Sequence, residues 1–97
     1  MAVIALRGEI DLAGLADLQS AVEPHLGPGQ TVVLDLSGVT FADSTLLKVL
    51  SHARGRADDL RGALLVRNPS DQVRQLLTIG DLDDLVHAEV DRQNHLP

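Results

Sequence analysis

Three oxygen-bearing side chains, those of Asp43, Ser44 and Thr45, follow one another where an apolar segment gives way to an amphipathic one. Apolar residues recur after them at the three- and four-residue spacing of a helix, which places all three in its first turn. The N–H groups of a first turn lack helical partners and lie at the positive end of the helix dipole. A phosphorylated hydroxyl is stabilised there, but the same residue types are common in an ordinary helix cap. The local sequence therefore leaves both a phosphorylation site and a plain cap open.

The composition of the chain excludes several classes of function. The chain has 97 residues, enough for one domain, with a formal net charge of −6, no cysteine and a single aromatic residue, Phe41. The negative charge opposes binding to phosphate backbones and anionic membranes, and one aromatic ring provides no platform for stacking bases. Thiolate and disulfide chemistry is excluded, and the apolar runs are too short to span a membrane. We expect a cytoplasmic protein that binds neither nucleic acid directly nor membranes.

Strand-like and helix-like patterns alternate along the chain. Buried strands are expected at residues 2–6 and 31–36 and a third strand at 63–67, with Ser37 and Gly38 beginning a loop. Between and after them, amphipathic helices have apolar stripes at residues 15–26, 46–60 and 73–77, and residues 82–86 resemble a short return toward the sheet. This alternation predicts the α/β class, with a small, mostly parallel sheet and crossover helices.

The ends of these elements and of the domain are also predicted. Asp11 is expected to cap the first helix, and Asn68 the last one, with Pro69 in its first position. Residues 1–90 are expected to form one domain and residues 91–97 a flexible polar tail. Because the sheet is small, one of its edges is either open or paired with a second copy of the chain, which leaves a homodimer open.

The sequence gives little support for a metal site or for catalysis. No two histidines have the i, i+4 spacing of ligands on one helix face; they are His25, His52, His87 and His95. A triad of Ser44, His52 and an aspartate is conceivable, but Ser44 lacks a Gly-x-Ser-x-Gly elbow and His52 lies about two helical turns away. We therefore expect no metal and no enzymatic activity.

Three segments of the chain resemble the STAS domain. They are Gly8-Glu9-Ile10-Asp11, residues 33–45 and residues 73–77 with Gly80 behind them. The resemblance covers nearly the whole chain in the right order. STAS domains occur in bacterial anti-sigma-factor antagonists and in the tails of sulfate transporters, so the resemblance implies a STAS-like α/β fold.

For the antagonists, the resemblance implies a phosphorylation switch. The serine directly after the motif aspartate Asp43 is Ser44, and it would be phosphorylated by an anti-sigma factor that is itself an ATP-dependent serine kinase. The unmodified chain would bind that kinase and free the sigma factor, the phosphorylated chain would let go, and a phosphatase would reset it. No cofactor of its own is implied.

The same resemblance implies the surface that binds the partner. It consists of the start of the helix and the Gly8–Asp11 segment beside it, with the following residues: Asp11, Asp43, Ser44, Thr45, Leu46 and Leu47. Where the family often has glycine, this chain has Leu46, which we expect to present a larger apolar surface to the partner. The alternative to the switch is a scaffold of the same fold that is not phosphorylated, such as a regulatory subunit of a transport or stress-signalling complex.

Overall fold

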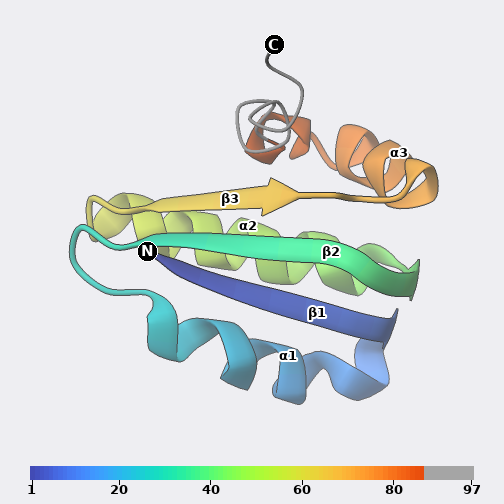
Figure 1. Cartoon of the computed structure of the whole chain (residues 1–97), viewed down its shortest axis with the longest axis horizontal. Helices are drawn as coiled ribbons and strands as arrows, with labels where there is room; N and C mark the ends of the chain where they lie inside the picture. The colour runs from blue at the N-terminus through green and yellow to red at the C-terminus, as the bar shows by residue number, and fades with distance from the viewer. Residues whose placement is uncertain (87–97) are drawn as a thin grey trace, which may run out of the picture.

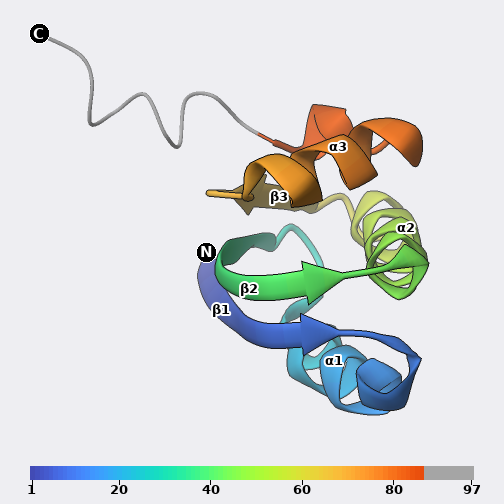
Figure 2. The same ribbon diagram turned by 90° about the vertical axis from the view of Figure 1, so that its right-hand side faces the viewer.

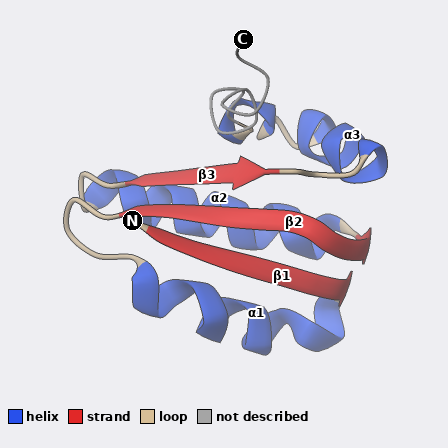
Figure 3. Cartoon of the chain, viewed as in Figure 1, coloured by secondary structure: helices blue, strands red, loops and turns tan. Residues whose placement is uncertain are grey.

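Three parallel strands form the centre of the computed structural model, which describes residues 1–86 (Figure 1). The strands are β1 (Ala2–Ile10), β2 (Thr31–Ala42) and β3 (Ala63–Arg67), in the order β1-β2-β3. The helices are α1 (Leu15–Val22), α2 (Ser44–Asp59) and α3 (Asp71–Ile79), with 3₁₀ turns at η1 (Leu12–Gly14), η2 (Glu23–His25) and η3 (Asp83–Leu85). This arrangement confirms the predicted α/β class, with parallel strands joined by crossover helices (Figure 3).

One layer of aliphatic side chains holds the sheet to the helices. Helices α1 and α2 lie on the same side of the sheet (Figure 2). Strand β2 contributes side chains that are fully buried against α2, and the largest buried side chains of these two elements are Leu34, Leu36, Leu46 and Leu50. Such burial contributes about 1.5–3 kcal/mol for each large aliphatic side chain. The position of α2 over the sheet is therefore set by its buried stripe.

The first two strands are longer than predicted. Strand β1 continues to Ile10, and β2 continues through Ser37 and Gly38, where we expected a loop, as far as Ala42. The extra pairing contains two register shifts, which let polar residues remain in the ladder. A Cβ atom on Gly38 would lie 3.1 Å from the carbonyl oxygen of Leu6, so glycine permits the close approach of strands β1 and β2. A pattern of apolar residues alone could not reveal this extension.

Strand β1 also differs from the prediction in its burial. Its residues alternate between more and less exposed positions instead of being buried on both faces. The reason is that successive side chains of a strand point to opposite faces, and α1 and α2 pack on one face only (Figure 2). Because β1 is also an outer strand within residues 1–86, only β2 shields its other face from the side.

The helices follow the predicted stripes, with one corrected cap. Helix α2 begins at Ser44, and the expected first helix is a shorter α1 between two 3₁₀ turns. The cap of α3 is Ser70, whose Oγ accepts a hydrogen bond from the N–H of Val73 at 3.2 Å. The prediction of Asn68 as this cap is wrong, because Asn68 lies two residues further upstream in a left-handed conformation with φ of 56°.

The return toward the sheet is confirmed as a short contact. After η3, Val86 forms an isolated parallel bridge with Val66 of β3. The end of the domain at residue 90 and the polar tail at 91–97 lie outside the described residues.

Two glycines make a direct test of the turn between α2 and β3. A Cβ atom on Gly62 would lie 2.2 Å from the backbone oxygen of Gln30, whereas one on Gly55, exposed in α2, would meet nothing within 4 Å. We expect Gly62→Ala to lower the free energy of unfolding by about 1–3 kcal/mol. Gly55→Ala should raise it by roughly 0.5–1 kcal/mol, since alanine favours a helix interior. Urea unfolding measures both, and equal effects of the two substitutions would contradict the described packing.

Candidate functional site

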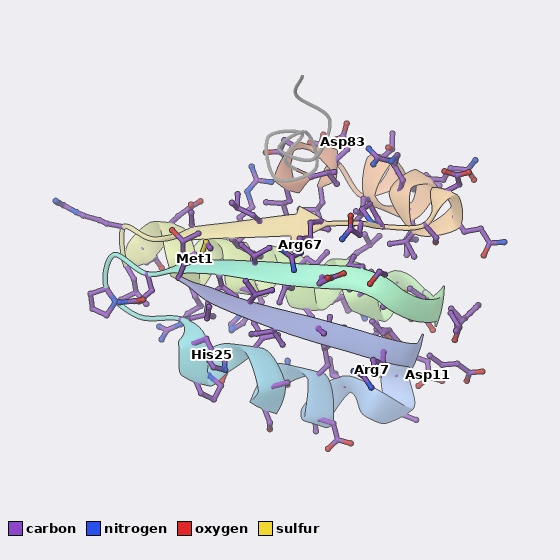
Figure 4. All side chains as sticks on the ribbon, in the orientation of Figure 1. Met1, Arg7, Asp11, His25, Arg67 and Asp83 are labelled. Carbon is purple, nitrogen blue, oxygen red and sulfur yellow. The ribbon has the colours of Figure 1, made fainter. Side chains whose placement is uncertain are left out.

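The ends of β1 and β2 meet the first turn of α2. Ile10 and Ala42 are paired in the ladder, and the N–H of Asp43 donates a hydrogen bond to the carbonyl oxygen of Ile10 at 3.2 Å. Asp11 and Asp43 therefore follow paired residues of neighbouring strands. Figure 4 shows Asp11 at the end of the sheet where these strands stop. The Gly8–Asp11 segment lies beside the start of α2, as the resemblance implied, although most of it is strand.

Asp43 is the N-cap residue of α2. Its backbone is extended (φ −117°, ψ −164°), and its Oδ1 accepts a hydrogen bond from the N–H of Thr45 at 2.8 Å. That hydrogen bond holds the pKa of the Asp43 carboxyl below its ordinary value, and the charge of Lys48 one turn along α2 lowers the pKa further. The start of the helix therefore carries a negative charge at neutral pH.

Ser44 is the first residue of α2, and its side chain is exposed. Within residues 1–86 its hydroxyl makes no hydrogen bond, because the neighbouring Asp43 caps the helix instead. The two interpretations of the local sequence thus fall on different residues: the cap is Asp43, and Ser44 is left with a hydroxyl that is open to solvent.

The three residues after Ser44 were expected on the surface that binds the partner, but none of them is fully exposed. Thr45 is buried, and Leu46 has 0% of its surface exposed. Leu47 is half-buried and packs against Gly80 at the end of α3, where a Cβ atom would lie 2.7 Å from Leu47 Cδ2. The prediction that Leu46 presents an apolar surface to a partner is wrong, because the turn that exposes Ser44 directs Leu46 into the core. Binding of a partner by Thr45 and Leu47 stays a prediction.

Asp11 has a structural role that is plain in the structure. Its Oδ1 accepts a hydrogen bond from the N–H of Ala13 at 3.1 Å, so it caps η1, the turn that leads into α1. The prediction that Asp11 caps the first helix is therefore correct only for this turn, because α1 itself has Gly14 as its N-cap and no side-chain cap. A role for Asp11 in binding a partner stays a prediction.

Two apolar side chains at this end of the sheet were missed from the sequence. Leu12, directly after β1, is 68% exposed, and Phe41, near the end of β2, is 51% exposed. Phe41 also lines a cavity of about 290 Å³ with neighbouring residues of β2 and the first turn of α3: Thr40, Ala42, Gln72 and Val73. The signal that could have found Phe41 was its place as the single aromatic residue, immediately before the polar start of α2.

The described residues do not assemble the catalytic or metal-binding alternatives. His52 Nε2 lies 3.5 Å from Glu23 Oε1 and sits about 12 Å along α2 from Ser44, so the two cannot form a triad. Within residues 1–86 no three histidine, aspartate or glutamate side chains are grouped as metal ligands. His87 and His95 lie outside the described residues.

Comparison with known proteins decides the family. The family model described as "Mlab, STAS domain" matches residues 1–87. The chain belongs to the STAS domain family. STAS domains are generally binding domains and not enzymes. Among the curated proteins, none matches the sequence significantly.

Solved STAS structures share the fold. The anti-sigma factor antagonist SpoIIAA in its unphosphorylated form matches with a TM-score of 0.71 and 20% identity, over 98% of this chain and 89% of that one. The Bacillus cell fate determinant SpoIIAA in the phosphorylated form matches with a TM-score of 0.70 and 18% identity, over 97% of this chain and 89% of that one. The STAS domain of a SulP transporter from Vibrio cholerae matches with a TM-score of 0.66 and 23% identity, over 91% of this chain and 69% of that one. At these identities the likeness establishes the STAS fold, and within residues 1–86 no helix is long and apolar enough to cross a membrane.

The cap predicts a pH dependence of stability. Because the pKa of Asp43 is lowered by folding, its ionised form stabilises the fold above the ordinary pKa of the group, and this contribution is lost as the pH falls through the lower folded value. Asp43→Asn keeps a capping oxygen but removes the charge. In urea titrations we expect wild type to have a higher free energy of unfolding than Asp43→Asn at neutral pH. This difference in free energy should shrink below about pH 4. A difference that stays constant through the acid range would contradict a charged cap.

The corrected position of Leu46 makes a second prediction. Leu46→Ala removes buried methyl groups and should lower the free energy of unfolding by about 2–5 kcal/mol. Ser44→Ala, two residues away on the exposed side, is the matched control and should change it by less than about 0.5 kcal/mol. Chemical unfolding measures the stability of both variants. If Leu46→Ala were as stable as Ser44→Ala, Leu46 would lie on the surface and its described burial would be wrong.

Proposed function

We propose that this domain is an anti-sigma-factor antagonist that binds an anti-sigma-factor serine kinase and is switched off by phosphorylation at Ser44. The observation that carries the proposal is the hydroxyl of Ser44, which is exposed, free of hydrogen bonds within residues 1–86 and held at the first position of α2. The likeness to SpoIIAA, solved in unphosphorylated and phosphorylated forms, supports this choice.

The charges around Ser44 support a switch that acts on binding. A phosphate would add nearly two negative charges. The positive end of the α2 dipole would stabilise it by about 1 kcal/mol or less, while the ionised Asp43 next to it would oppose it. These effects largely cancel within the domain. In an interface, like charges or an unpaired buried charge cost several kcal/mol, so phosphorylation should change affinity far more than stability.

The kinase would supply the chemistry of phosphoryl transfer. In the reaction the Ser44 oxygen forms a bond to the γ-phosphorus of ATP, the bond to ADP breaks, and the hydroxyl proton leaves to a base. Asp43 is poorly placed to be that base, because its Oδ1 already accepts the Thr45 N–H and its low pKa makes it a weak proton acceptor. A base on the kinase would take the proton, and a phosphatase would remove the phosphate later. The domain itself would have no enzymatic activity and need no cofactor.

The exposed apolar residues complete the proposed surface. Phe41 and Leu12 flank the ends of the two strands that lead to Asp11 and Asp43. Aromatic side chains, phenylalanine included, are enriched in protein interfaces relative to the rest of the surface. We therefore add Phe41 and Leu12 to the partner surface and leave Leu46 out.

The likeness to the STAS domain of a SulP transporter favours a second candidate. In that case the domain would be a scaffold or regulatory subunit of a transport complex and would bind its partner regardless of the state of Ser44. A cytoplasmic location fits both candidates.

Mass spectrometry of the chain recovered from its native cell tests the modification. We expect phosphate on Ser44 and its loss in Ser44→Ala. Thr40→Ala removes another exposed hydroxyl near the end of β2 and should leave the phosphate in place. Phosphate on Thr40 instead of Ser44 would contradict the proposed acceptor.

Binding to the serine-kinase anti-sigma factors of the same cell tests the switch. Ser44→Ala should bind like wild type, whereas Ser44→Asp should bind about tenfold or more weakly, since it places a fixed charge in the interface. The phosphorylated and unmodified domains should melt at nearly equal temperatures. Equal affinities of Ser44→Asp and wild type would reject the switch and favour the scaffold.

A further inference from the structure

Two side chains are exposed among the first five residues of α2. They are Ser44 and Lys48, whereas Thr45 and Leu46 are buried and Leu47 is half-buried. Residues four apart lie on the same face of a helix, with their Cβ atoms about 5–6 Å apart. The hydroxyl of Ser44 and the ammonium group of Lys48 therefore share one exposed face, one helical turn apart.

The geometry of a helix directs the side chain of Lys48 back toward Ser44. Each Cα–Cβ bond of a helix tilts toward the N-terminus, so a long side chain covers the turn before its own position. The charge of Lys48 acts at that turn, because it contributes to the low pKa of the Asp43 carboxyl. An anion followed four residues later by a cation is also the favourable order for an ion pair on a helix. An anion on Ser44 would thus lie within reach of Lys48.

Lys48 takes part in no ion pair within residues 1–86. The charged contacts there involve other side chains, and they are Arg54 with Asp84, Arg67 with Asp35, and His52 with Glu23. Lys48 is also the single lysine of the chain. Its ammonium group is therefore not engaged by another charge of the described fold and is free to bind a new anion.

Other charged side chains lie on the segments around this turn. Helix α3 contacts α2 where Gly80 packs against Leu47, and β1 ends beside the start of α2. The charged side chains of the cap and of these neighbouring segments are mainly acidic, and they are Glu9, Asp11, Asp43, Asp71, Arg74 and Asp81. The cation of β1, Arg7, lies further back in the sheet, opposite Gly38. Arg74 is therefore the cation that competes with Lys48 for an anion on Ser44.

We propose that Lys48 positions the phosphate on Ser44 and keeps it doubly charged, through an ion pair along the exposed face of α2. This role rests on the proposed phosphorylation of Ser44. The second pKa of a phosphorylated serine is about 6. The ionised Asp43 beside the phosphate raises that pKa toward neutrality, where part of the phosphate would carry only one negative charge. The ammonium group of Lys48 acts in the opposite direction and so gives the switch its full charge at neutral pH.

The full chain made with phosphoserine at position 44 tests the proposal without a kinase. A titration followed by phosphorus NMR measures the second pKa of the phosphate. Lys48→Met removes the charge but keeps an aliphatic side chain, and it should raise this pKa by about 0.3 pH units or more, as expected for an ion pair between residues four apart. Lys48→Arg keeps the charge and should restore the value of the unsubstituted chain.

Two matched substitutions show whether the effect belongs to Lys48. Arg56→Met removes another exposed cation of α2, about 18 Å along the helix from Ser44, and should leave the pKa of the phosphate unchanged. Arg74→Met removes the competing cation of α3 and should also leave it unchanged. Equal phosphate pKa values with and without Lys48→Met would overturn the proposal. So would a larger shift in Arg74→Met than in Lys48→Met.

The single lysine of the chain provides a second readout. In protein labelled with lysine that is enriched for NMR, the side-chain amine signal belongs to Lys48 alone. With phosphate on Ser44, this signal should shift as the phosphate titrates between about pH 5 and 7. The unmodified chain is the control, because any effect of His52, one turn beyond Lys48, is present in both forms. Identical pH profiles of the two forms would contradict the ion pair.

The outcome does not depend on whether a cell phosphorylates Ser44. Because the phosphate is supplied with the chain, a missing ion pair would remove the role of Lys48 and leave the phosphorylation switch intact. A lack of phosphate on Ser44 in the native cell would instead remove the switch, while the titration would still show whether a phosphate at this position pairs with Lys48.

Discussion

One contact layer, between the aliphatic side chains of the sheet and those of the helices, holds the described structure together. It contains Leu34 and Leu36 from β2 and Leu46 and Leu50 from α2, all fully buried. The single aromatic residue of the chain, Phe41, is half exposed and contributes little to this layer. Without large rings, the fold depends on many aliphatic contacts of similar size. The removal of any one of them is costly, because a small domain has a thin stability margin.

The exposure of Ser44 is a consequence of this layer. Successive residues of a helix point about 100° apart, so a turn that buries Leu46 must direct a residue close to it toward solvent. Asp43 completes the arrangement, because its carboxylate satisfies the N–H of Thr45 and leaves the hydroxyl of Ser44 free. A larger apolar residue at position 46, where the family often has glycine, therefore strengthens the core under the site and leaves the surface of the site unchanged.

The sequence predicts some elements closely because their signals are local. The bounds of β3 and the start of α2 follow from an apolar run and from a polar first turn before a helical stripe. The extension of β1 and β2 was not predictable in this way, since Ser37 and Gly38 remain in a strand only through pairing with β1 across two register shifts. The cap of α3 was misplaced for a similar reason. Asn68, Ser70 and Pro69 are all favourable near a helix start, and the backbone geometry decides among them.

The positions of the two central residues of the candidate site were predicted, and the positions of the residues around them less well. Asp43 and Ser44 stand out by residue type, and they lie where the sequence placed them. The burial of Leu46 and the exposure of Phe41 depend on how α2 and α3 sit against the sheet. Residue type argues for the opposite in the second case, because a lone aromatic residue is normally expected in a core.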